Sequence, residues 1–184
     1  MTEILSDRAR EFVLGLEEFS SPNLSAGRKG SIPDTVIFGF TNDRSFHENF
    51  MDKSYGKAPH YVILRDGKVR NYIEVTDSSR IFTTSAVSDS EKYYGRADGL
   101  VSCRAVNVAQ YSVCVLFEGD RPTVEQMLAA AALLRLISLK FIRIYRKKLP
   151  LDENHIISAT VLPSEYNFDI DIRIIIELCR KKPI

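Results

Sequence analysis

Residues Asn107–Gly119, with the sequence NVAQYSVCVLFEG, contain the stretch that decides the fold. Within it the run Val113–Phe117 is continuously apolar, which is typical of a central strand buried on both faces. A polar turn follows, and Thr123 with Gln126 then forms the Thr-x-x-Gln pattern of a capping box at the start of a long helix. A buried strand that turns directly into a capped helix is a scaffold on which a site could be built.

The chain on the N-terminal side of this strand predicts three further strands. Thr35–Thr41 has high β propensity, and His60–Leu64 is a second apolar run. Arg65–Lys68 contains Asp-Gly, which suits a tight turn, so Val69–Val75 should return as the second strand of a hairpin. The polar stretch 77–106 is long for a connection and is expected to form a loop that shapes a surface.

Helical periodicity appears at both ends of the chain and after the central strand. We expect an amphipathic helix over Thr2–Phe19, a largely buried helix over Val124–Tyr145 and a last helix capped by Asp169. The sequence therefore predicts a single-domain α/β protein with a mixed central β-sheet covered by helices. The expected division is an N-terminal helix and linker at 1–33 and the domain at 34–184.

Composition narrows the classes of partner. With 184 residues, 27% charged residues and a formal net charge of +1, the chain has no global field that favours nucleic acid. No run approaches the roughly 20 apolar residues of a membrane span, and no signal peptide is recognised, so a cytoplasmic location is expected, with delivery by another route as the alternative. Cys114 and Cys179 are expected to be buried thiols.

A cluster of cations marks the end of the long helix. It consists of Lys140, Arg143, Arg146, Lys147 and Lys148. One interpretation is complementation of the helix dipole and solvation of the helix end. The other is a docking patch for an anionic ligand.

Four segments together resemble the zinc-dependent N-acetylmuramoyl-L-alanine amidases, whose fold is shared with peptidoglycan recognition proteins. Thr35–Thr41 resembles the family strand that ends in His-x-Thr, and Ala58–Val69 is similar to the Ser-x-His-x-x-Ile-x-x-Asp-Gly hairpin. Asn107–Gln126 is similar to the Asn-x-x-Ser-Ile-Gly-Ile-Glu strand with its Thr-x-x-Gln helix start. Asn154-His155, followed by 163–169, resembles the Gly-His and Asp-Pro-Gly segments. The resemblance implies an amidase-like fold over residues 35–181.

The same resemblance implies where the chemistry should lie. The family holds zinc with a His at the end of the first strand, a second His, and an Asp or Cys eight to ten residues later. Here the first position falls on Gly39 or Phe40, the second on His155 and the third near Glu165. The carboxylate that many members place in the central strand falls on Leu116. Since a zinc site needs three protein ligands, we expect no intact site, with His155 and Glu165 as the remaining metal-binding candidates.

The implied groove is expected to include the side chains of Thr41, His60, Tyr61, Leu116, His155 and Glu165. The first hypothesis is a catalytically degenerate amidase-like protein, without a cofactor, that binds a peptidoglycan fragment or a protein partner. The second is an active N-acetylmuramoyl-L-alanine amidase, with zinc held in a site rebuilt from His47 or His60 with His155 and Glu165. The third is a structural or interaction component of a phage or secretion assembly.

Overall fold

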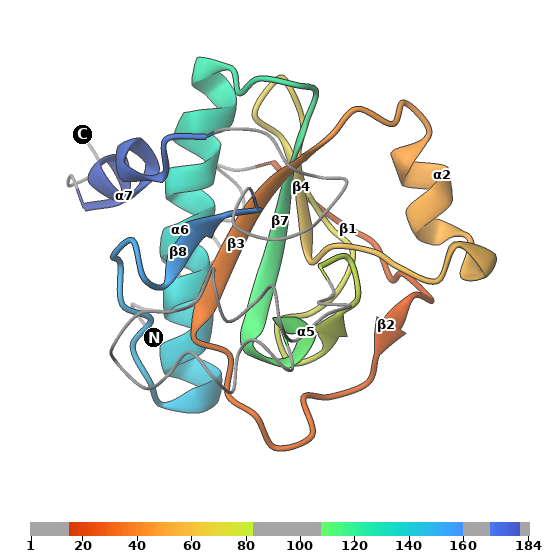
Figure 1. The fold of residues 1–184 in the computed structure, drawn as a ribbon, viewed down its shortest axis with the longest axis horizontal. Coiled ribbons are helices and arrows are strands. Elements are labelled where there is room, and N and C mark those ends of the chain that lie inside the picture. The colour runs from red at the N-terminus through yellow and green to blue at the C-terminus, as the bar shows by residue number, and fades with distance from the viewer. Residues whose placement is uncertain (1–14, 83–107, 160–169, 181–184) are drawn as a thin grey trace, which may run out of the picture.

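The computed structural model describes residues 15–82, 108–159 and 170–180. The ordered elements are β1 (Leu16–Glu18), β2 (Leu24–Ser25), β3 (Thr35–Thr41), α2 (Phe46–Met51), the 3₁₀ turn η1 (Lys53–Tyr55), β4 (Tyr61–Ile63), β5 (Val69–Asn71), β6 (Ser78–Ser79), α5 (Val108–Tyr111), β7 (Ser112–Glu118), α6 (Val124–Tyr145), β8 (Ile156–Ser158) and α7 (Ile172–Arg180). Strands and helices are intermixed through the described residues, as expected for a mixed α/β protein (Figure 1).

Six strands form one mixed sheet in the order β1-β5-β4-β7-β3-β8, and β2 pairs with β6 in a separate ribbon. The predicted central strand is confirmed, because β7 lies between β4 and β3 and pairs in parallel with both. The β4–β5 hairpin is confirmed as the antiparallel pair of the sheet. The carboxyl ends of β3, β7 and β4 consequently meet at one edge of the sheet.

Each face of the sheet is covered by a different hydrophobic cluster. Phe38, Phe117 and Tyr61 point to the face that packs against α6 and α7. Ile37, Leu116 and Val62 alternate with them and point to the other face, where they pack with α2 and with residues 72–82 (Figure 1). We call the face of the sheet that α6 covers the helix face, and the face that α2 covers the opposite face.

The long helix begins as predicted. Thr123 accepts from the backbone N–H of Gln126 at 3.1 Å, and the Gln126 side chain accepts in return from the backbone N–H of Thr123 at 2.9 Å. The Gln126 amide also donates to the carbonyl oxygens of Ile63 and Glu118. This one buried side chain therefore ties the start of α6 to the ends of both β4 and β7.

Two expected elements differ in the structure. Residues 16–18, expected to end a helix at Phe19, form β1 instead, in parallel register with Val69–Asn71. Residues 2–14 of that expected helix lie outside the described residues. The returning hairpin strand ends at Asn71 rather than Val75, since the chain after it turns to cover the opposite face of the sheet.

Candidate functional site

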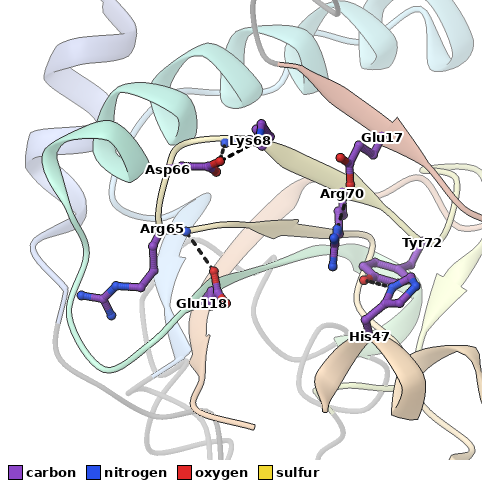
Figure 2. Close-up of polar contacts among 8 residues, drawn as sticks. All are labelled: Glu17, His47, Arg65, Asp66, Lys68, Arg70, Tyr72 and Glu118. Carbon is purple, nitrogen blue, oxygen red and sulfur yellow. Dashed lines mark hydrogen bonds and ion pairs between the residues drawn. The ribbon is translucent and has the colours of Figure 1, made fainter. Parts of the chain in front are cut away.

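The carboxyl ends of three neighbouring strands carry the polar groups of the candidate site. Thr41 ends β3 and lies in register with Glu118 at the end of β7, and Arg65 follows β4. The Glu118 carboxylate accepts from the backbone N–H of Arg65 at 3.0 Å, so the Arg65 guanidinium is not the group that holds it (Figure 2). Clefts at the carboxyl ends of parallel strands are where open α/β sheets bind ligands. We call Thr41, Arg65 and Glu118 the carboxyl-end rim.

Gly119 leaves room for the Arg65 side chain at this rim. Its backbone has φ +102°, a conformation that favours glycine, and a Cβ atom added there would collide with the Arg65 guanidinium. Among the described residues, no carboxylate lies within ion-pair distance of that guanidinium. Arg65 is exposed and can therefore bind an anionic group of a ligand.

Two of the positions to which the resemblance assigns zinc chemistry, the first ligand and the central carboxylate, are apolar. Gly39 lies in register with Leu116, and Leu116 in register with Val62, across three adjacent strands. Leu116 and Val62 have no exposed surface and belong to the cluster on the opposite face. Neither side chain has a lone pair that can bind zinc or activate water. A continuous apolar layer therefore occupies the position of the family's first ligand and its central carboxylate.

Tyr61 does not belong to the expected groove. It lies on the helix face of the sheet, where Lys140 lies 6.0 Å from the centre of its ring. Since side chains alternate along a strand, Tyr61 points away from Leu116 and from its own neighbours His60 and Val62.

His60 is completely buried, and backbone groups bind both of its ring nitrogens. The N–H of Cys114 donates to Nδ1 at 3.0 Å, so the proton of the neutral ring lies on Nε2, which donates to the carbonyl of Asp77 at 3.1 Å. Arg28 Nη2 lies 2.9 Å from the same Nε2. Protonation of Nδ1 would place its N–H against the N–H of Cys114, and it would put a second cation beside Arg28. Burial first, and Arg28 second, hold the pKa of His60 well below its usual value.

This lowered pKa predicts that acid weakens the fold. At pH values between the lower pKa of His60 in the folded state and its pKa of about 6.5 in the unfolded state, His60 binds a proton in the unfolded chain but not in the folded chain. The free energy of unfolding should fall by up to about 1.4 kcal/mol for each pH unit below 6.5. Urea denaturation from pH 7.5 to 5.5 measures this slope. His60→Asn should remove most of it, whereas an unchanged slope in that variant would contradict the assignment to His60.

His47 and His155 lie apart from the candidate zinc position. His47 Nδ1 lies 2.7 Å from the Tyr72 hydroxyl (Figure 2). The His47 ring also contacts Phe19. His155 Nδ1 lies 2.7 Å from the Asp152 carboxylate. The parallel register of β8 with β3 pairs Ile156 with Val36, so His155 lies beside Thr35, about 13 Å along the strand from Gly39.

His60 and His155 lie too far apart to bind the same zinc ion. All three histidines of the chain are among the described residues. His60 directly precedes β4 and His155 directly precedes β8, and two other strands lie between these two, which separates the histidines by about 14 Å. Within residues 15–82, 108–159 and 170–180, no group of three or more His, Cys, Asp or Glu side chains is arranged to hold a metal. Glu165 lies outside these ranges.

Sequence reasoning missed two residues of this region. Arg65 was interpreted only as a turn residue, although its position after β4 at the carboxyl edge is a signal that could have identified it. Arg28 falls in the stretch that the sequence predicts to be a linker. Arg28 is buried and its guanidinium donates to four backbone carbonyls, and no sequence pattern predicts partners of that kind.

No protein-family model and no curated protein matches the sequence. Solved structures do match the fold. A crystal structure of AmpD as its selenomethionine derivative gives a TM-score of 0.58 at 13% identity, over 89% of this chain and 94% of AmpD. The solution structure of Citrobacter freundii AmpD gives 0.50 at 12% identity, over 92% and 95%.

An endolysin of Clostridium intestinale URNW, the N-acetylmuramoyl-L-alanine amidase LysCS, also matches, with a TM-score of 0.44 at 18% identity over 68% of this chain and 74% of its own. The AmpD matches confirm the amidase-like fold that the sequence predicted. In the part of the chain that the structure describes, no helix is long and apolar enough to cross a membrane.

Proposed function

We propose that this chain is a catalytically degenerate protein with the amidase-like fold, which binds a peptidoglycan fragment without hydrolysing it. One observation carries the proposal: Gly39, Leu116 and Val62 form an apolar layer at the positions where the resemblance to zinc-dependent amidases implies a ligand and a carboxylate. Amide hydrolysis with zinc needs an activated water, and this layer offers nothing that binds or deprotonates one.

The carboxyl-end rim supports the choice of ligand. The peptide stems of peptidoglycan carry free carboxylates, and a guanidinium is the side chain that binds a carboxylate best. Arg65 presents such a group at the edge of the sheet, and the Glu118 carboxylate, held by the Arg65 backbone, limits how much negative charge enters beside it. The cytoplasmic location expected from the sequence remains part of the proposal, with recycled cell-wall fragments as the source of the ligand.

The test separates binding from hydrolysis. The full chain is titrated with a muramyl tripeptide in a calorimeter, and the mixture is then analysed by mass spectrometry with and without one equivalent of zinc. We expect saturable binding, an intact ligand in both mixtures, and less than one zinc per chain by elemental analysis. Arg65→Ala should weaken binding about tenfold, because it removes a charge-assisted contact. Arg44→Ala, at another exposed arginine, is the matched control and should leave binding unchanged.

Two outcomes would contradict the proposal in different ways. Zinc-dependent release of the peptide, with one zinc per chain that disappears in His155→Ala, would support the rebuilt amidase. No muropeptide binding, together with an intact fold, would instead favour a protein partner as the ligand.

A further inference from the structure

The C-terminal end of α6 exposes four cations within six residues. These are Arg143, Arg146, Lys147 and Lys148, and the aliphatic side chains of Ile142 and Ile144 are exposed beside them, at 45% and 41%. We call these six residues the α6 basic patch. Lys140 is not part of it, because Lys140 pairs with Glu74 at 3.4 Å.

Dipole complementation does not account for the whole patch. Arg143 lies in the last turn, where a cation stabilises a helix, but Arg146 caps the helix and the two lysines lie beyond it. No carboxylate among the described residues comes within ion-pair distance of any of the four cations. They repel one another, so the patch is a concentrated positive charge on a chain whose net charge is only +1.

We propose that the α6 basic patch docks the protein on an anionic phospholipid surface. Clusters of Lys and Arg bind the phosphate layer of a membrane, and each cation near the surface strengthens binding about fivefold. An aliphatic group beside the cations favours a membrane over other polyanions. Ile142 is exposed one turn before Arg146, so its side chain can enter the boundary between headgroups and acyl chains while the cations stay at the phosphates.

The position of the patch leaves the carboxyl-end rim accessible. α6 starts beside that rim and runs back along the sheet for 22 residues, about 33 Å, so the patch lies at the opposite end of the sheet (Figure 1). A protein docked by this patch would present the rim to the solution. The proposal does not depend on the ligand proposed for the rim.

Vesicle co-sedimentation of the full chain tests the proposal. We expect binding to vesicles of phosphatidylglycerol with phosphatidylcholine, no binding to phosphatidylcholine alone, and release at 0.5 M NaCl through screening. The double variant Arg143→Gln/Lys147→Gln should partition about 25-fold more weakly. Lys29→Gln/Lys53→Gln removes two exposed cations elsewhere and should bind like the parent.

Arg146→Gly separates a loss of binding from a loss of folding. Arg146 has φ 56°, where glycine is favoured, so this change should stabilise the fold and lower the equilibrium constant for unfolding about twofold to fivefold. The same change should weaken vesicle binding about fivefold. No binding of the parent to the anionic vesicles would overturn the proposal. Equal partitioning of Ile142→Ser/Ile144→Ser, with equally tight binding to duplex DNA, would also overturn it in favour of a general polyanion site.

Discussion

Replacing Arg28 by Met should destabilise the fold by about 3 kcal/mol, although Arg28 belongs to a segment with little regular structure. The guanidinium is 5% exposed and donates to the carbonyls of Val75, Gln110 and Ser112 at 2.7, 2.6 and 3.1 Å. Methionine fills much of the volume but donates nothing, and each buried carbonyl left without its donor costs about 1 kcal/mol or more. The free energy of unfolding from urea denaturation measures the loss.

Lys29→Met is the control for this change, because Lys29 is the exposed neighbour and should shift stability by less than about 0.5 kcal/mol. The carbonyl partners of Arg28 come from three places: Val75, the end of α5 and the start of β7. Loss of the Arg28 guanidinium should therefore loosen the contact of residues 20–33 with the sheet, and it should also lower the urea concentration at the midpoint of unfolding. A loss below about 1 kcal/mol in Arg28→Met would contradict the view that this guanidinium joins those segments.

The sequence identified those elements whose signal is local. The apolar run of β7, the Thr-x-x-Gln start of α6 and the Asp-Gly turn of the hairpin each depend on residues within one short window. The strand β1 does not: Leu16–Glu18 extend because Val69–Asn71 lie beside them, 53 residues further along the chain. Taken alone, residues 16–18 continue the helical spacing of apolar residues that precedes them. Pairing with β5 determines their extended conformation instead.

The candidate site was predictable in its apolar part and not in its geometry. Matching Leu116 to the family's carboxylate required only the sequence of β7. The place of His155 required the register of β8 on β3, which sets it beside Thr35 rather than near Gly39. A one-residue motif such as His contains no information about register, because backbone hydrogen bonds between distant strands fix it.

Restoring the family's carboxylate with Leu116→Glu should cost more than about 4 kcal/mol at pH 7. Leu116 is fully buried between Gly39 and Val62, and truncating a buried leucine alone costs about 2–5 kcal/mol. An ionised carboxylate in this apolar layer adds a desolvation penalty, since Leu116 packs in a cluster of buried hydrophobic side chains. Burial raises the pKa of such a carboxyl group, so the introduced acid should be neutral in the fold and ionised when unfolded.

The sign of the pH dependence distinguishes this penalty from poor packing. Above the unfolded pKa of about 4.3 the unfolded variant releases a proton that the folded variant keeps, so its stability should fall as pH rises from 4.5 to 7. Leu116→Gln has nearly the same shape without the titrating group, and the stability difference between the two variants should shrink toward pH 4.5. Urea denaturation across this range measures it, with Leu116→Met as a volume-conserving reference that loses less than about 1.5 kcal/mol. A pH-independent difference, or a Leu116→Glu protein as stable as the parent at pH 7, would mean that water reaches this position and that the layer is open enough to hold a working carboxylate.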